Sequence, residues 1–124
     1  MIVMDTYAWI EYFLGSKKGE IVKKHLDDTL ITPSIVLIEI SCKSAKEKWN
    51  FQELLQFIKS KSQVKEMNEE VIEKAGKIYA EQRNKKSKFS MIDASIWAIA
   101  ENLKAKVLTG DEHFKDYKEV IMIV

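Results

Sequence analysis

Two kinds of hydrophobic pattern follow one another along the chain, and they predict a series of strands and helices. Short runs of apolar residues are typical of buried strands, whereas apolar positions that recur at steps of three and four are typical of helices packed on one face. The strand-like runs cover residues 2–4, 30–32, 64–67, 106–109 and 120–123, and the run at 64–67 is the weakest of them.

Helical patterns fill the segments between these strands. Ile35, Ile38 and Cys42 recur on one face of the third predicted helix. Asn68 and Ser90 stand where a polar side chain caps the start of a helix. Strands that alternate with helices in this way predict an α/β fold with a parallel, doubly wound sheet. The predicted helices cover residues 6–14, 19–26, 33–49 and 51–60, a segment that follows Asn68 and a segment that follows Ser90.

Length and composition restrict the class of protein without identifying a function. The 124 residues fit a single domain, residues 1–124, and no stretch has the composition of a linker. The net charge is +1, so overall charge does not indicate a nucleic-acid-binding protein. Cys42 is the only cysteine, and no apolar run approaches the roughly 18 residues of a membrane span. A cytoplasmic protein without membrane contact is therefore expected.

Four acidic residues lie in apolar surroundings, unlike most of the 19 in the chain. Asp5 ends the first predicted strand, and Asp111 follows the strand predicted at 106–109. Glu39 and Asp93 interrupt apolar helical segments. An unpaired carboxylate is unfavourable in such surroundings, so these four side chains are expected to be paired, bound to a metal ion or locally exposed.

An α/β fold allows the four carboxylates to meet at one edge of the sheet. In open α/β sheets, ligands bind beyond the carboxyl ends of the strands, where the strand order reverses. Two unit charges about 4 Å apart repel by roughly 4 kcal/mol at an effective dielectric near 20, so a cluster of carboxylates is better suited to holding divalent cations. Mg²⁺ or Mn²⁺ in such a site can activate water and hold the oxygens of a phosphodiester.

Each of the four acids also has a purely structural interpretation. Asp93 has the spacing of a capping box with the serine that starts its helix. Glu39 precedes Lys43 by four residues, which is the spacing of an ion pair within a helix. Asp5 and Asp111 stand where a carboxylate can cap a helix or a turn. The sequence leaves both interpretations open for each residue.

The ordered set of motifs resembles the PIN-domain family, particularly the small VapC-type toxins of toxin–antitoxin pairs. The matching stretches are IVMDT at 2–6, TPS at 32–34, IEI at 38–40, SMIDASIWA at 90–98 and LTGDEHF at 108–114. They span essentially the whole chain in the order of the family. The set is more specific than any one of its pieces.

This resemblance implies a three-layer α/β/α sandwich with a central parallel sheet, in which the first and fourth strands are adjacent. It also implies Mg²⁺- or Mn²⁺-dependent hydrolysis of RNA and a cognate antitoxin protein as partner. The implied metal-binding and catalytic residues are Asp5, Glu39, Asp93 and Asp111, supported by the hydroxyls of Thr6 and Thr109.

Two positions depart from the pattern of the family. Tyr7 stands where many relatives have a small polar residue, so that side of the site differs from the family pattern. His113 stands where many have a further aspartate, and we expect it to face solvent rather than to contact RNA. Two isolated histidines and one cysteine do not make a zinc site.

A basic stretch directly precedes the helix that carries Asp93. By itself such a stretch is usually a solvated loop. Beside an acidic site it is also suited to contact the phosphates of RNA, because lysine and arginine neutralise the phosphate backbone. The predicted RNA-binding residues are Arg83, Lys85, Lys86 and Lys88.

The first predicted helix is apolar on nearly every face, from Tyr7 to Leu14. A helix of this kind must be covered on all sides. We therefore predict a homodimer, with a segment of the antitoxin over the apolar surface that remains near this helix.

Several other functions fit the sequence less well. A receiver-type signalling domain needs paired acids after its first strand, where Asp5 stands alone. A phosphatase of the haloacid-dehalogenase type needs an aspartate at the position of Tyr7. Two alternatives stay open: a PIN-like RNA-processing nuclease outside toxin–antitoxin pairs, and a catalytically silent PIN-like binding module.

Overall fold

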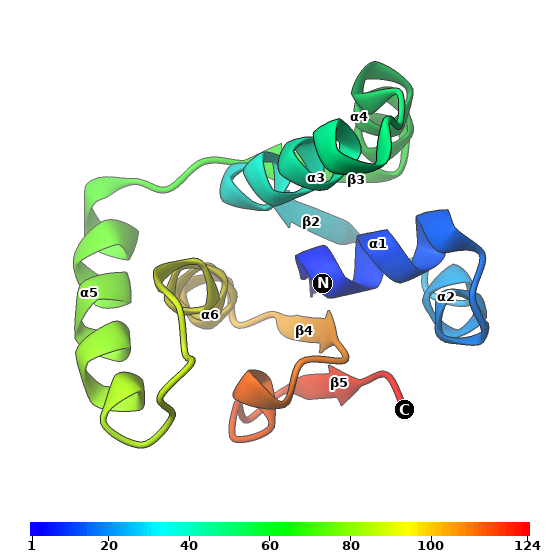
Figure 1. Cartoon of the computed structure of the whole chain (residues 1–124). Coiled ribbons are helices and arrows are strands. Elements are labelled where there is room, and N and C mark those ends of the chain that lie inside the picture. Colours follow the sequence, from blue (N-terminus) through cyan, green and yellow to red (C-terminus); the bar gives the residue numbers. More distant parts are fainter.

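A parallel sheet of five strands forms the centre of the computed structural model, which describes residues 1–124 (Figure 1). The strand order is β3-β2-β1-β4-β5, and every neighbouring pair is parallel. The predicted α/β fold with a parallel sheet is therefore confirmed. The strands are β1 (Ile2–Met4), β2 (Leu30–Pro33), β3 (Ser62–Lys65), β4 (Lys106–Thr109) and β5 (Val120–Met122).

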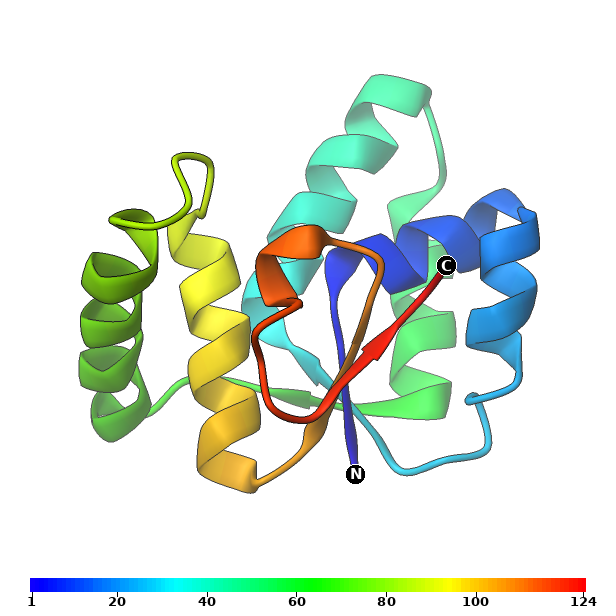
Figure 2. The ribbon, with the colours of Figure 1, turned by 90° about the horizontal axis from the view of Figure 1, so that it is seen from below.

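Helices cover both faces of this sheet. Figures 1 and 2 show α5 and α6 together on one side, and α1 and α2 together on the other. None of the helices is long and apolar enough to cross a membrane. The helices are α1 (Thr6–Leu14), α2 (Lys17–Lys23), α3 (Ser34–Glu47), α4 (Phe51–Lys61), α5 (Glu69–Arg83) and α6 (Met91–Leu103), with a short 3₁₀ helix η1 (Glu112–Phe114).

The strand order reverses between β1 and β4, and this reversal positions the candidate site. The chain passes from β1 to β2 and β3 on one side, then crosses to β4 and β5 on the other. Val3 pairs with Ile31 of β2 and with Val107 of β4. Asp5 N donates to the Leu108 carbonyl at 3.3 Å, so the ends of β1 and β4 lie side by side. Ligand sites of open parallel sheets form at such a point.

The hydrophobic core explains why the central strands are easy to recognise in the sequence. All three residues of β1 are buried, as are Val107, Leu108 and Thr109 of β4. Strands covered on both faces have continuous apolar runs. The edge strand β3 is only partly buried, and it lies at 62–65 instead of the predicted 64–67. Its pairing with β2, which brings Ser62 Oγ within 2.8 Å of Thr32 Oγ1, sets that position.

Helix α1 is covered largely by other parts of the same chain. Trp9 is fully buried, and its indole Nε1 donates to Thr32 Oγ1 at 3.0 Å. Tyr12 stacks on Phe57 of α4, with ring centroids 5.3 Å apart. Helix α2 packs against α1 closely enough that a Cβ on Gly19 would lie 2.3 Å from the Glu11 carbonyl oxygen. The aromatic residues of α1 therefore have an intramolecular function that does not depend on a dimer.

Candidate metal centre

Asp5 occupies the centre of the candidate site, at the junction of β1 and α1. Its side chain is only 4% exposed, and both carboxylate oxygens accept hydrogen bonds. Oδ1 accepts from the backbone N–H of Thr6 at 2.7 Å, and Oδ2 accepts from Thr109 Oγ1 at 2.5 Å. Thr109 Oγ1 also accepts from the backbone N–H of Asp111 at 2.9 Å. One threonine hydroxyl thus links the acids at the ends of β1 and β4.

Burial raises the pKa of Asp5 to about 7. The negative charges of Asp111 and Asp93 contribute to this rise in pKa, while the hydrogen bonds from Thr109 and Thr6 oppose it. The carboxylates of Asp93 and Asp111 therefore disfavour a negative charge on Asp5. A bound cation would relieve this repulsion.

Asp93 and Asp111 meet across His113. The imidazole Nδ1 of His113 lies 2.9 Å from Asp93 Oδ2 and 3.3 Å from Asp111 Oδ1. Ligand atoms from these three residues all lie within 4.8 Å of one another. The expectation that His113 faces solvent is only partly met, because its side chain is 27% exposed but the 3₁₀ turn η1 brings Nδ1 over the acids. The sequence signal for this placement was that His113 stands two residues after Asp111, where many members of the family have a further aspartate.

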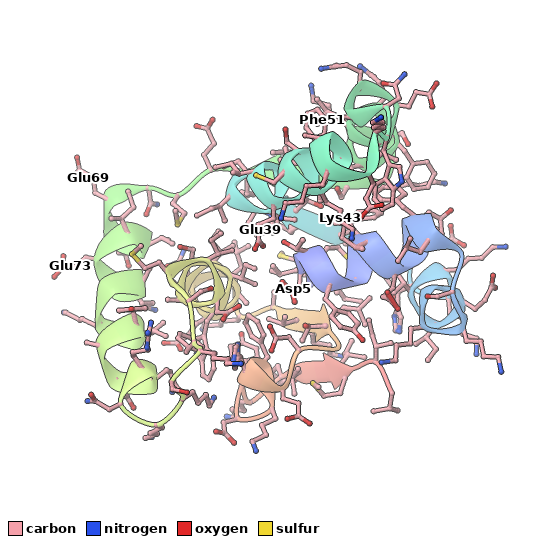
Figure 3. The ribbon with its side chains drawn as sticks, in the orientation of Figure 1. Asp5, Glu39, Lys43, Phe51, Glu69 and Glu73 are labelled. Atoms are coloured by element: carbon pink, nitrogen blue, oxygen red, sulfur yellow. The ribbon has the colours of Figure 1, made fainter.

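Glu39 approaches the site from α3 and is held by Thr6. Thr6 Oγ1 donates to Glu39 Oε1 at 2.5 Å, while the backbone N–H of Thr6 donates to Asp5. Figure 3 shows Glu39 on the side of α3 that faces the start of α1, where Asp5 lies. Glu39 is not part of the group formed by Asp93, Asp111 and His113. Thr6 therefore links Glu39 to Asp5, through its hydroxyl on one side and its backbone N–H on the other.

The structural interpretations of three acids prove compatible with a metal site. Asp5 caps α1, Asp111 caps η1, and Asp93 forms a capping box with Ser90. The capping oxygens are Oδ2 of Asp93 and Oδ1 of Asp111, and their other oxygens accept no hydrogen bond from the protein. Asp93 and Asp111 can therefore each cap a helix and keep an oxygen for a ligand, whereas both oxygens of Asp5 accept hydrogen bonds.

The donor set fits a small divalent cation. Carboxylate oxygens are the preferred ligands of Mg²⁺ and Mn²⁺. The ion pair that the sequence allowed between Glu39 and Lys43 is not formed, because Lys43 Nζ lies 3.4 Å from Glu47 instead. Glu39 consequently has no lysine that neutralises its charge within α3.

Lys86 contacts the protein itself, unlike the exposed lysines of the basic stretch, Lys85 and Lys88. Its Nζ donates to the His113 carbonyl at 2.8 Å and lies 3.4 Å from Asp116 Oδ2. The ammonium also lies over the Phe89 and Trp97 rings, and the side chain is 13% exposed. Lys86 therefore fixes the η1 segment in place.

The other basic residues of the stretch differ in whether their side chains contact the protein. Arg83 is exposed, but its Nη1 donates to Tyr79 Oη and to the Phe89 carbonyl. Lys85 and Lys88 are exposed. An RNA contact at this stretch consequently depends mainly on Lys85 and Lys88.

Lys86→Met is expected to lower the free energy of unfolding by about 2 kcal/mol, since it removes a charged donor from a carbonyl and a cation from two rings. Lys85→Met, with the same chemical change at an exposed position, should stay within about 0.5 kcal/mol of wild type. Urea unfolding of both variants measures the difference. Equal stability of the two variants would show that the Lys86 contacts do not hold η1.

Tyr7 also has a defined place in this structure. A Cβ added to Gly110 would lie 2.3 Å from Tyr7 Cε1, so the aromatic ring packs directly on the glycine after β4. Lys18 Nζ donates to Tyr7 Oη at 2.8 Å. The departure from the family at position 7 thus closes one side of the site with an aromatic ring.

Comparison with known proteins identifies the family. The PIN domain model matches residues 2–120, and the chain therefore belongs to the PIN domain family. No curated protein matches the sequence. The resemblance stated from the sequence motifs is thereby confirmed.

Solved structures show the same fold over the whole chain. A toxin–antitoxin complex from Klebsiella pneumoniae matches with a TM-score of 0.82 at 16% identity, covering 100% of this chain and 98% of that one. The VapC20 toxin of Mycobacterium tuberculosis, described as a Sarcin-Ricin loop cleaving toxin, gives 0.79 at 16% identity and covers 97% of both chains. VapBC2 from Rickettsia felis, bound to a DNA fragment from its promoter, gives 0.73 at 20% identity and covers 98% and 97%.

Proposed function

We propose that this protein is a metal-dependent endoribonuclease that hydrolyses phosphodiester bonds of RNA. The observation that carries the proposal is the convergence of Asp5, Asp93 and Asp111 where the sheet of a PIN domain reverses its strand order. A divalent cation such as Mg²⁺ or Mn²⁺ would offset their mutual repulsion and accept their oxygens as ligands.

Each side chain would have its own role in such a site. Asp93 and Asp111 would hold the cation, and Glu39 would approach it from α3. Thr109 fixes Asp5 relative to Asp111, and Thr6 fixes Asp5 relative to Glu39, in each case through hydrogen bonds to both residues. When bound, the divalent cation would activate water and stabilise the charge on the phosphate oxygens.

Assays of RNA cleavage with and without chelator test this function. Fragments of tRNA and rRNA should be cut by pure protein in Mn²⁺ or Mg²⁺ and left intact in excess EDTA. Asp111→Asn should reduce the rate at least about a hundredfold, because even changes one shell further from a metal can lose 10- to 100-fold. Binding of RNA without cleavage under all these conditions would favour the catalytically silent module instead.

The proposed partner is an antitoxin protein, and this places the nuclease in a toxin–antitoxin pair. A protein from such a complex shares the fold of this chain. A groove of about 410 Å³ borders Glu39 and Thr6, and its wall includes Ile38, which is 60% exposed. An apolar segment of the antitoxin would cover this groove. A short open reading frame directly upstream of the gene would support the toxin, whereas its absence would favour an RNA-processing nuclease.

A homodimer remains part of the proposal, although α1 gives it less support than the sequence suggested. Leu14 is 54% exposed at the end of α1, while the aromatic residues of this helix pack within the chain. Sedimentation of the isolated protein at micromolar concentration tests the dimer. A monomer alone would contradict it.

The proposed RNA contact of the basic stretch is testable by charge removal. Lys85→Ala with Lys88→Ala should weaken RNA binding and reduce the slope of log K against log salt by about 1.4, since each phosphate contact on a single strand contributes about 0.7. Lys59→Ala with Lys61→Ala is the matched control. These two lysines end α4, far from the loop between α5 and α6 (Figure 1). Equal slopes for the two double variants would make the stretch a solvated loop.

A further inference from the structure

His113 places a nitrogen donor inside a group of carboxylates. Its Nδ1 lies 2.9 Å from Asp93 Oδ2 and 3.3 Å from Asp111 Oδ1. Two donors that bind one ion at about 2.1 Å lie about 3.0 Å apart when they are neighbours in an octahedral site. His113 Nδ1 therefore lies, relative to each of the two carboxylates, near the distance expected between neighbouring ligands of one ion.

Contacts on several sides hold His113 in this position. Its backbone N–H donates to Asp111 Oδ1 at 2.9 Å, and its carbonyl accepts from Lys86 Nζ at 2.8 Å. The Phe89 ring packs against the imidazole, with centroids 6.0 Å apart. The side chain is 27% exposed, so one edge of the ring borders solvent. A donor held in this way needs little rearrangement to bind a metal ion.

We propose that His113 Nδ1 is a direct metal ligand beside Asp93 and Asp111, and that it makes the site select Mn²⁺ and other divalent transition-metal ions over Mg²⁺. The inference rests on the proposed function, because it concerns the same metal site. Mg²⁺ favours oxygen donors and keeps most of its water, whereas imidazole nitrogen binds transition-metal ions better. The nitrogen contributes little to Mg²⁺ binding. It therefore raises the affinity for transition-metal ions relative to the affinity for Mg²⁺.

A different role for His113 makes a different prediction. If Nδ1 only carries a proton that it donates to Asp93, the ring orients the carboxylates and never contacts the ion. The metal would then have oxygen ligands alone, and its preference would be that of a carboxylate site. The two roles differ in whether a nitrogen atom is bound to the ion.

Pulsed electron paramagnetic resonance of the Mn²⁺ complex detects such a nitrogen directly. The wild-type protein, prepared without a polyhistidine tag, should show the ¹⁴N modulation of a bound imidazole. His113→Asn should lose this modulation, and His25→Asn should keep it. His25 is the matched control because it is the other histidine of the chain and pairs with Asp28 at the surface, away from the acids.

Calorimetry with Mn²⁺ and with Mg²⁺ measures the selectivity that the nitrogen provides. The ratio of the Mg²⁺ to the Mn²⁺ dissociation constant should fall about tenfold in His113→Asn, with most of the change in Mn²⁺ affinity. His113→Asp, which replaces the nitrogen by oxygen, should restore binding of both ions without restoring the ratio. A structural role alone would not produce this separation.

The outcomes distinguish this inference from the function on which it rests. Mn²⁺ binding that disappears in Asp111→Asn but shows no ¹⁴N modulation in the wild type would overturn the role of His113 and leave the metal site intact. If the ratio of the Mg²⁺ to the Mn²⁺ dissociation constant is unchanged in His113→Asn, His113 is not the source of the proposed selectivity. If no Mn²⁺ binding depends on Asp111, both the inference and the proposed metal site are wrong.

Discussion

Asp5→Asn is expected to make the metal-free protein more stable than wild type at pH 8, although it removes a residue of the proposed active site. The buried carboxylate is charged at this pH and faces Asp93 and Asp111. Asparagine has nearly the same shape without the charge. Its amide oxygen can accept from Thr6 N, and its amide nitrogen can donate to Thr109 Oγ1, so both hydrogen-bonding positions of Asp5 stay filled.

The pH dependence of this effect has a defined sign. The pKa of Asp5 is about 7 in the folded protein and near 3.8 in the unfolded chain. Between these values the folded state binds more protons than the unfolded state, so the stability of the wild type falls as the pH rises from about 4 to about 7. At about 1.4 kcal/mol for each pKa unit, the total contribution of Asp5 is on the order of 4 kcal/mol as an upper estimate.

Urea unfolding in EDTA at pH 5 and pH 8 measures the difference between wild type and Asp5→Asn. The two proteins should be closest in stability at the lower pH, and the variant should be more stable at the higher pH. Titrating groups that do not interact with Asp5 affect both proteins alike and cancel in the comparison. A difference that does not change with pH would contradict a raised pKa of Asp5.

Addition of Mn²⁺ should reverse the order of stability at pH 8. An ion that binds only the folded state at 100 times its dissociation constant stabilises that state by about 2.7 kcal/mol. The wild type should gain this stabilisation, and Asp5→Asn should gain much less because it lacks one carboxylate of the site. An equal gain in both proteins would place Asp5 outside the metal site.

Asp93→Glu is expected to give a folded but nearly inactive protein. Glutamate suits the third position of a capping box, so the start of α6 should form and the free energy of unfolding should stay within about 1 kcal/mol of wild type. The extra methylene moves the carboxylate by about 1.5 Å, whereas a catalytic group tolerates only about 0.5 Å. A displacement near 1 Å can reduce a rate about a hundredfold.

Ser90→Ala provides the complementary change. Ser90 Oγ accepts from the backbone N–H of Asp93 at 3.0 Å, while the Ser90 backbone still donates to the Asp93 carboxylate. The variant should lose about 1 kcal/mol of stability through its missing cap and should keep its activity. Thermal melting and RNA cleavage, measured on both variants, separate the two roles of Asp93. An active Asp93→Glu protein would reduce this residue to a helix cap.

The central part of the fold follows from sequence because its signals are strong and local. Residues 2–4 and 106–109 form strands covered on both faces, which makes their apolar runs continuous. The edge strand β3 contains Ser62, Gln63 and Lys65, and pairing with β2 determines where it lies. Such pairing is a tertiary effect that no local pattern contains.

The candidate site was only partly predictable, for a similar reason. Asp5 and Asp111 are recognisable because an acid directly after a buried strand is conspicuous, and the topology then brings them together. The contribution of His113 depends on the direction of a side chain after a 3₁₀ turn, which hydrophobic periodicity does not contain. Lys86 has the composition of a surface lysine, and only the fold places it on the His113 carbonyl.

The chemical nature of the RNA ends is the most direct test of a metal-dependent ribonuclease. Hydrolysis by a water molecule that the metal activates leaves a 5′-phosphate and a 3′-hydroxyl. Attack by the ribose 2′-hydroxyl, which needs no metal, leaves a 2′,3′-cyclic phosphate. We predict that wild-type protein with Mn²⁺ produces 5′-phosphate ends, and that these ends are absent in EDTA and with Asp5→Asn. Cyclic phosphate ends that form equally well in EDTA would contradict the proposed function.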